Sequence, residues 1–299
     1  MDGPGGRDQG EGRNRRRLRR GPLAAGGIAA TLNLDYKEQV MPDSRNPHGS
    51  FIWYELLTAD PDSAATFYRD VIGWTAASAG QPGVDYRLFL AEGVPVAGHM
   101  KLPDGAAEAG MRPGWLGYIG VDDVDDAVTD IVNAGGKVHM PAMDLEGVGR
   151  IALVADPQGV PFYVMRGASE EASTSFDPTK AGHCHWNELS TPDQAGALAF
   201  YTGRFGWEKG DLMPMGEMGG YQFVHHGGGM IGAVMTSPPG RPAGWNFAFG
   251  VRDIDQVAAK IPAAGGAVHH GPIEVPGGDW VVMASDPQGG AFMAVGPRK

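Results

Sequence analysis

The sequence predicts an α+β protein made of two tandem copies of one domain, each built from two βαβββ modules. The first observation is length: a chain of 299 residues exceeds the usual size of one domain and suffices for two of about 100–150 residues. The second is an internal repeat that runs through most of the chain. The third is that each copy contains the order strand, helix and three short strands twice.

The repeat is clearest where FIWYELLTADPDSAATFYRDVIGW, residues 51–74, recurs as HCHWNELSTPDQAGALAFYTGRFGW, residues 183–207. Trp53, Glu55, Leu56, Thr58, Asp60, Phe67, Tyr68, Gly73 and Trp74 recur as Trp186, Glu188, Leu189, Thr191, Asp193, Phe200, Tyr201, Gly206 and Trp207. Further along, Gly114-Trp115, AGG at 134–136 and DPQG at 156–159 recur at 244–245, 264–266 and 286–289. Matches in this order indicate a duplication.

The elements of each copy follow from local signals. Residues 51–58 read as a strand, Asp60 is placed to cap the following helix, and Pro61 suits its first position. Gly73 ends that helix, and strand-like runs follow at 86–90 and 94–101. The pattern restarts at residue 114, and DPQG forms a turn before the last strand.

The predicted boundaries are an extension over residues 1–45, a first domain over 46–167, a linker over 168–180 and a second domain over 181–299. The extension is rich in glycine and arginine and lacks a hydrophobic period, so we predict that it is disordered. A misplaced start codon, with Met41 as the true start, is the favoured reading of this segment, a disordered tail is the second and a weak export signal is the third.

Composition excludes several partners. The formal net charge is −11, and because residues 1–40 hold more basic than acidic side chains, the remainder is still more acidic. Such a chain repels phosphate backbones, so no nucleic acid partner is expected. No apolar run is long enough to span a bilayer, so no membrane partner is expected either. The one cysteine, Cys184, excludes an intrachain disulfide and fits the cytoplasm. Since one chain holds four modules, a monomer or weak homodimer is expected.

The doubled W-x-E-L-x-T-x-D, F-Y, G-W and D-P-Q-G motifs resemble the vicinal oxygen chelate superfamily of glyoxalases, bleomycin-resistance proteins and extradiol dioxygenases. The resemblance covers about residues 49–166 and 181–296 and is greatest to two-domain actinobacterial glyoxalase-like proteins, including the mycobacterial antigen type. It implies that paired βαβββ modules curl into a cupped sheet around a small ligand. The fold class is therefore a tandem duplication of glyoxalase-like domains.

The resemblance also locates the positions that hold the metal in metal-using members. They fall on Trp53, Leu116 and Tyr163 in the first cup and on Trp186, Asn246 and Met293 in the second. These side chains do not make a metal site. A fourth position, near Gly98-His99 and Gly232-Ala233, does not complete one. We therefore predict no metal and no other cofactor, and these six residues become candidates for ligand binding.

Histidines offer an alternative metal site. In the H-x-H-x-x-E run, strand alternation directs His183 and His185 away from the face of Trp186 and Glu188, towards the helices. Structural hydrogen bonds are then the favoured role of these histidines. An unusual site that joins Glu188 to His183, His185, His225 or His269 stays open.

Glu55 and Glu188 are the candidate catalytic residues. Each follows an inward tryptophan by two positions, so it should point into its cup and be partly dehydrated, which raises a carboxyl pKa and suits acid–base work. The alternative is that each accepts structural hydrogen bonds. Five aromatic residues are candidates to line a flat slot, namely Trp53, Trp115, Tyr163, Trp186 and Trp245. The equal alternative for the tryptophans at strand starts is that they fill the core.

The sequence thus predicts a glyoxalase-like protein that binds or transforms a small carbonyl compound or planar metabolite in a cupped cavity, without the usual metal. As an enzyme it would be a glyoxalase-like lyase or isomerase. The alternative is a binding protein of the bleomycin-resistance kind that sequesters an antibiotic or metabolite. Whether one or both cups work stays open.

Overall fold

The computed structural model describes Met1 and residues 45–299, apart from 82, 107, 109, 239 and 241. Most of the predicted N-terminal extension, with the alternative start at Met41, lies outside the described residues. All the helices and strands below belong to one compact unit. None of the helices described is both long and apolar enough to cross a bilayer.

The first repeat forms one eight-stranded sheet in the order β2-β3-β4-β1-β5-β8-β7-β6. Its first module consists of β1 (Phe51–Thr58), α1 (Pro61–Val71), β2 (Thr75–Ser78), β3 (Arg87–Ala91) and β4 (Val94–Lys101). Its second module consists of β5 (Gly114–Gly120), α2 (Val124–Asn133), β6 (Lys137–Leu145), β7 (Gly149–Ala155) and β8 (Pro161–Gly167). The predicted βαβββ order is confirmed.

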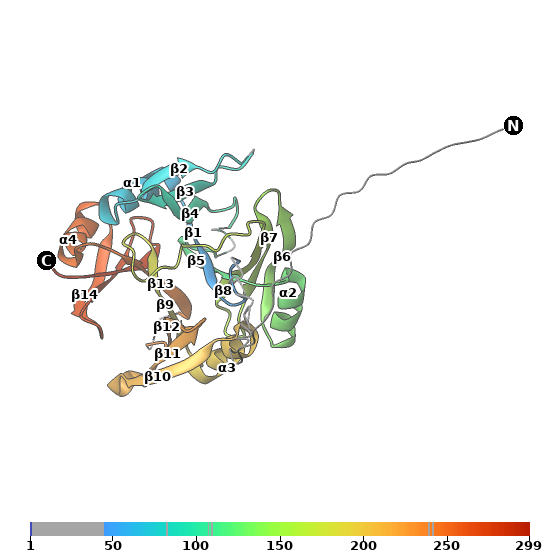
Figure 1. The fold of residues 1–299 in the computed structure, drawn as a ribbon. Coiled ribbons are helices and arrows are strands. Elements are labelled where there is room, and N and C mark those ends of the chain that lie inside the picture. Colours follow the sequence, from blue (N-terminus) through green and yellow to red (C-terminus); the bar gives the residue numbers. More distant parts are fainter. Residues whose placement is uncertain (2–44, 82, 107, 109, 239, 241) are drawn as a thin grey trace, which may run out of the picture. The chain divides into compact units, whose positions relative to one another are not determined.

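The second repeat forms an eight-stranded sheet in the matching order β10-β11-β12-β9-β13-β16-β15-β14 (Figure 1). Its first module consists of β9 (Cys184–Thr191), α3 (Gln194–Phe205), β10 (Glu208–Pro214), the 3-10 helix η1 (Gly216–Met218), β11 (Gly220–His226) and β12 (Gly229–Thr236). Its second module consists of β13 (Gly244–Gly250), α4 (Ile254–Ala263), β14 (Ala267–Glu274), β15 (Trp280–Ser285) and β16 (Ala291–Gly296).

The four helices begin where an aspartate precedes them. Asp60, Asp123, Asp193 and Asp253 each accept at least one hydrogen bond from a backbone N–H of the first turn. These bonds satisfy donors that a helix otherwise leaves unpaired.

Strand pairing assigns side chains to two faces of each sheet. In the first sheet, Glu55 on β1 pairs with Leu116 on β5 and with Gly98 on β4. In the second, Glu188 pairs with Asn246 and with Ala233. Since directly paired residues share a face, these define what we call the inner face of each sheet. The opposite, outer faces carry the large aromatic core that the two repeats share.

Aromatic hydrogen bonds join the repeats reciprocally. The indole N–H of Trp74 donates to the carbonyl of Gly182 (2.7 Å), and that of Trp207 donates to the carbonyl of Gly49 (2.8 Å). Near the middle, the Tyr54 hydroxyl donates to the side-chain oxygen of Asn187 (2.8 Å). The tryptophans of the repeated G-W motif therefore help to hold the two repeats together.

Candidate functional site

The inner face of the first repeat carries a tryptophan, a tyrosine and a glutamate in contact. The indole N–H of half-buried Trp53 donates to the hydroxyl of Tyr86 (2.8 Å). Tyr86 lies close to Gly98, where a Cβ atom would stand only 2.0 Å from the tyrosine oxygen. Because Gly98 has no side chain, the Tyr86 ring can lie over it, next to Glu55, which is the strand partner of Gly98.

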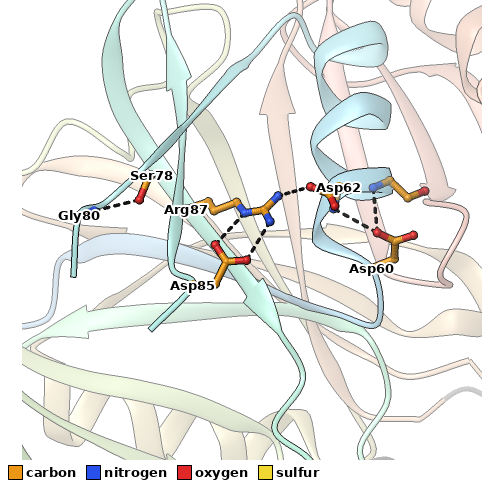
Figure 2. Close-up of polar contacts among 7 residues, drawn as sticks. Asp60, Asp62, Ser78, Gly80, Asp85 and Arg87 are labelled. Atoms are coloured by element: carbon orange, nitrogen blue, oxygen red, sulfur yellow. Dashed lines mark hydrogen bonds and ion pairs between the residues drawn. The ribbon is translucent and has the colours of Figure 1, made fainter. Parts of the chain in front are cut away.

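Arg87, the residue after this tyrosine and the first of β3, anchors that strand. Its guanidinium donates two hydrogen bonds to Asp85 (2.8 and 2.9 Å) and one to Asp62 at the start of α1 (2.5 Å). Figure 2 shows the guanidinium between these two carboxylates, and the backbone N–H of Asp62 donates to the carboxylate of the helix cap Asp60. Fork-shaped pairing fixes orientation as well as distance. It therefore holds β3 against α1.

Glu55 lies at the centre of a group of phenols. Its Oε2 accepts a hydrogen bond from the Tyr118 hydroxyl (2.9 Å), and the Tyr118 and Tyr163 rings stack with centroids 4.2 Å apart. Burial raises the pKa of Glu55, while hydrogen bonds from Tyr118, Tyr86 and Tyr163 oppose that rise. Burial also raises the pKa of Tyr118 and Tyr163, so both phenols remain protonated donors.

The inner face of the second repeat reproduces the tryptophan–tyrosine–glutamate chain. The indole N–H of Trp186 donates to the hydroxyl of Tyr221 (2.7 Å), which donates to Oε2 of Glu188 (2.7 Å). Burial, followed by the nearby Glu188 carboxylate, raises the pKa of Tyr221. The phenol is therefore held protonated between an N–H donor and a carboxylate acceptor.

The two inner faces differ beside this shared chain. Tyr118 pairs with Tyr163 in the first sheet, and in the same register Ala248 pairs with Met293 in the second. The strand partner of the glutamate changes from Leu116 to Asn246. The second face therefore lacks the stacked phenols and gains an amide beside its carboxylate.

The structure places all six predicted ligand-binding residues on the inner faces. Trp53, Leu116 and Tyr163 lie in or against one apolar cluster, and Trp186 and Met293 in or against its counterpart. Asn246 is the strand partner of Glu188. Their roles in binding stay predictions.

Two of the tryptophans considered for a flat slot take the alternative role, that of filling the core. Trp115 and Trp245 are buried in the outer core, where their indoles donate to Tyr68 (2.9 Å) and Tyr201 (3.3 Å). Each directly precedes an inward residue on its strand, and alternation turns it to the other face.

The H-x-H pair does not meet Glu188. A ring nitrogen of His183 contacts the carbonyl of Thr174, and one of His185 contacts the carbonyl of Lys180 (2.8 Å). Both partners belong to the segment that connects the two repeats. Structural hydrogen bonds are what the sequence favoured for them.

The side chains on the inner faces do not fit the metal of the metal-using relatives. The corresponding positions offer indole, phenol, isobutyl, thioether and one amide group, and the carboxylate of Glu55 is enclosed by phenols. His225 lies on β11, and a ring nitrogen of His269 contacts the Ser285 hydroxyl (3.0 Å). Among the described residues no three His, Cys, Asp or Glu side chains gather as a metal would require.

Three tyrosines of this arrangement were not identified from the sequence. Tyr118 lies two positions after Leu116 on β5, so strand alternation alone was enough to assign it to the inner face. Tyr86 directly precedes β3 and Tyr221 lies at the start of β11, and only the folded structure shows that their hydroxyls lie next to the glutamates.

Two cavities lie away from both inner faces. One of about 420 Å³ is lined by the end of α1 and by α4, including Trp74, Arg252 and Lys260. The other, of about 220 Å³, is lined by α2 and the end of α3. No predicted site residue lines either cavity. The chemistry of the inner faces, rather than cavity size, therefore identifies the candidate site.

Solved structures share this architecture. The Mn(II)-bound glyoxalase from Novosphingobium aromaticivorans superposes with a TM-score of 0.57 at 19% identity, covering 86% of this chain and 84% of the other. A variant of homoprotocatechuate 2,3-dioxygenase from B. fuscum, in complex with HPCA, superposes with a TM-score of 0.60 at 16% identity, covering 85% and 73%. At these identities the likeness shows the fold.

Curated relatives match at the sequence level. "Putative glyoxylase CFP32" of Mycobacterium tuberculosis is 36% identical over 82% of this chain and 94% of its own length. "Anthracycline biosynthesis protein DnrV" of Streptomyces peucetius is 32% identical over 84% and 94%. "Anthracycline biosynthesis protein DauV" of Streptomyces sp. strain C5 is 31% identical over the same shares.

The paired βαβββ sheets and their inner faces define a tandem glyoxalase-fold protein. The model of the Glyoxalase/Bleomycin resistance protein/Dioxygenase superfamily matches residues 50–164 and again residues 180–293. The chain belongs to that superfamily, with one family domain in each repeat.

Proposed function

We propose that this glyoxalase-like chain binds a small planar or carbonyl-bearing metabolite on an inner face and uses the glutamate–tyrosine pair there to hold or move a proton. The observation that carries this proposal is the arrangement of a tryptophan, a tyrosine and a glutamate on each inner face: Trp186 donates to Tyr221 and Tyr221 to Glu188 in the second repeat, and Trp53 donates to Tyr86 beside Glu55 in the first. A half-buried indole offers a flat surface for stacking, and the protonated phenol beside it offers a donor to a ligand oxygen.

The acid–base role follows from the surroundings of the pair. A carboxylate next to a phenol whose pKa is raised forms a donor–acceptor pair that can take a proton from carbon and return one to oxygen. No step requires a metal, and the inner-face side chains do not fit one. Both repeats retain the pair, so both glutamates, Glu55 and Glu188, remain candidates for the base.

The alternative is a binding protein that sequesters an antibiotic or another planar metabolite. The aromatic residues of the inner faces support this alternative. Two relatives are named for the biosynthesis of anthracyclines, which are flat, quinone-bearing compounds. This function needs stacking and hydrogen bonds but no proton transfer.

One experiment separates the two functions. The purified full chain is titrated with 1,4-dihydroxyanthraquinone, with tryptophan emission as readout, and is separately incubated with dihydroxyacetone in D2O. Binding together with protein-dependent deuterium uptake at carbon supports the enzyme. Binding without uptake supports sequestration, and the absence of both contradicts the proposal. Elemental analysis of the same sample measures its metal content.

A further inference from the structure

The first inner face is occupied by its own aromatic rings. Tyr118 and Tyr163 are 6% and 8% exposed, and their rings stack at an interplanar angle of 20°. Tyr118 donates to Glu55, which is only 3% exposed. The stacked phenols therefore cover this carboxylate and lie where a flat ligand would have to stack. A ligand has to break these contacts before it reaches Glu55.

The second inner face lacks this covering pair. In the register where Tyr118 meets Tyr163, the second sheet has Ala248 beside Met293. Ala248 and Met293 are as buried as the two phenols, at 1% and 3% exposed, but they bring no second ring to this face, and methionine adapts readily to an irregular neighbour. Trp186 and Tyr221 are half-buried, and Tyr221 donates to Glu188.

Asn246 adds a specific polar group to that face. It is the direct strand partner of Glu188, so the two side chains emerge side by side, with Cβ atoms about 5 Å apart. Asn246 is half-buried, so part of its side chain stays accessible on that face. The first repeat has Leu116 there. An amide offers both a donor and an acceptor.

We propose that the ligand site lies on the inner face of the second repeat alone, and that Asn246 selects flat conjugated rings whose edge carries a hydrogen-bond donor next to an acceptor. A lactam edge meets an asparagine amide with two parallel hydrogen bonds while the ring stacks on Trp186. The inference rests on the proposed function, because it assumes that an inner face binds a planar molecule.

The test uses 6(5H)-phenanthridinone, a flat lactam, and phenanthridine, which keeps the rings but lacks the N–H donor and the carbonyl. Both are titrated into the full chain by calorimetry. We expect one phenanthridinone per chain, bound about tenfold or more tightly than phenanthridine, as the loss of a paired set of hydrogen bonds implies. Equal affinities, or two equivalent sites per chain, overturn the proposal.

Matched variants locate the site. Asn246→Leu installs the residue of the first repeat and should weaken phenanthridinone about tenfold while leaving phenanthridine unaffected. Leu116→Asn is the reverse exchange on the first face. If Leu116→Asn rather than Asn246→Leu changes the affinity, the site assignment is wrong. Phenanthridinone should quench the tryptophan emission of the wild type, and this quenching should disappear in Trp186→Phe. If it disappears in Trp53→Phe instead, the proposal is overturned.

The outcomes also separate this inference from the proposed function. Binding of the anthraquinone but not of the lactam overturns the ligand class assigned to Asn246 and leaves the proposed function standing. Failure of every flat compound to bind contradicts the proposed function, and this inference with it. Melting temperatures of all variants show whether each has kept its fold.

Discussion

The hydroxyl of Tyr68 in α1 donates a hydrogen bond to Asp286 in the D-P-Q-G turn of the other repeat (3.2 Å). Reciprocally, the hydroxyl of Tyr201 in α3 of the second repeat donates to Asp156 in the D-P-Q-G turn of the first repeat (3.2 Å). Each turn leads directly into the last strand of its sheet, which carries an inner-face residue. The helix of one repeat therefore positions part of the inner face of the other.

Tyr68→Phe and Tyr201→Phe should each lower the free energy of unfolding by about 1–3 kcal/mol, because each leaves a buried carboxylate and an indole N–H without their shared partner. Urea unfolding of the full chain measures this change. Asp70→Asn, an exposed change on α1, is the control. Unfolding midpoints that match the wild type would show that these bonds contribute nothing.

Glu55 should make stability fall as pH rises. Burial raises its pKa above the ordinary 4.5, so between that value and the raised pKa the folded chain holds a proton that the unfolded chain has lost. The stabilisation is complete below the ordinary pKa and is lost as pH rises through the raised one.

Glu55→Gln removes this dependence. The free energy of unfolding of the variant, compared with that of the wild type, should improve as pH rises from about 4 to about 8. Asp156 and Asp286, whose pKa values burial also raises, are present in both proteins and cancel in the difference. A difference that stays constant across this range contradicts the assignment.

His99→Leu should stabilise the chain by about 1–2 kcal/mol at neutral pH. His99 is fully buried and stacked on Phe89, and neither ring nitrogen has a hydrogen-bond partner among the described residues. Val234 holds the same register position in the second repeat, so an apolar side chain suits the site.

The gain from His99→Leu should grow in acid. Burial and then the charge of Arg87 lower the pKa of His99 to about 4, although Asp85 and Asp62 oppose the shift. The wild type therefore loses stability as pH falls from the ordinary 6.5 towards 4, and the variant does not. Unfolding curves at two pH values measure the effect, and a variant less stable than the wild type at both would refute it.

Glu188→Gln should lower deuterium exchange into dihydroxyacetone by about 100-fold with the fold intact, because the amide keeps the shape but cannot accept the proton. Glu55→Gln should have the smaller effect, since phenols already cover that carboxylate. If both variants change the melting temperature alone, the glutamates are structural. Glu→Ala at either position would then cost about 1–3 kcal/mol.

The sequence predicted what is local or repeated. The aspartate caps and the βαβββ order followed from spacing, and the inner-face placement of Trp53 and Trp186 followed from the family resemblance. For Trp115 the sequence left both a slot and a core role open, although its alternation with Leu116 already pointed to the core.

Other features depend on contacts that no local pattern contains. The D-P-Q-G turn was recognised, but the partner of Asp286 lies 218 residues earlier in the chain. The hydroxyls of Tyr86 and Tyr221 contact residues on other strands, and Gly98 allows the first of these approaches. Such contacts depend on strand register and on the packing of the two repeats.

The most direct test of the central claim is a titration of 1,4-dihydroxyanthraquinone against the wild type and Tyr221→Phe, followed by tryptophan emission. Tyr221 accepts from Trp186 and donates to Glu188, so its hydroxyl joins the stacking surface to the carboxylate. The account predicts saturable binding to the wild type, weakened about tenfold in a variant with an unchanged melting temperature. Equal binding to both proteins, or no saturable binding to either, would contradict it.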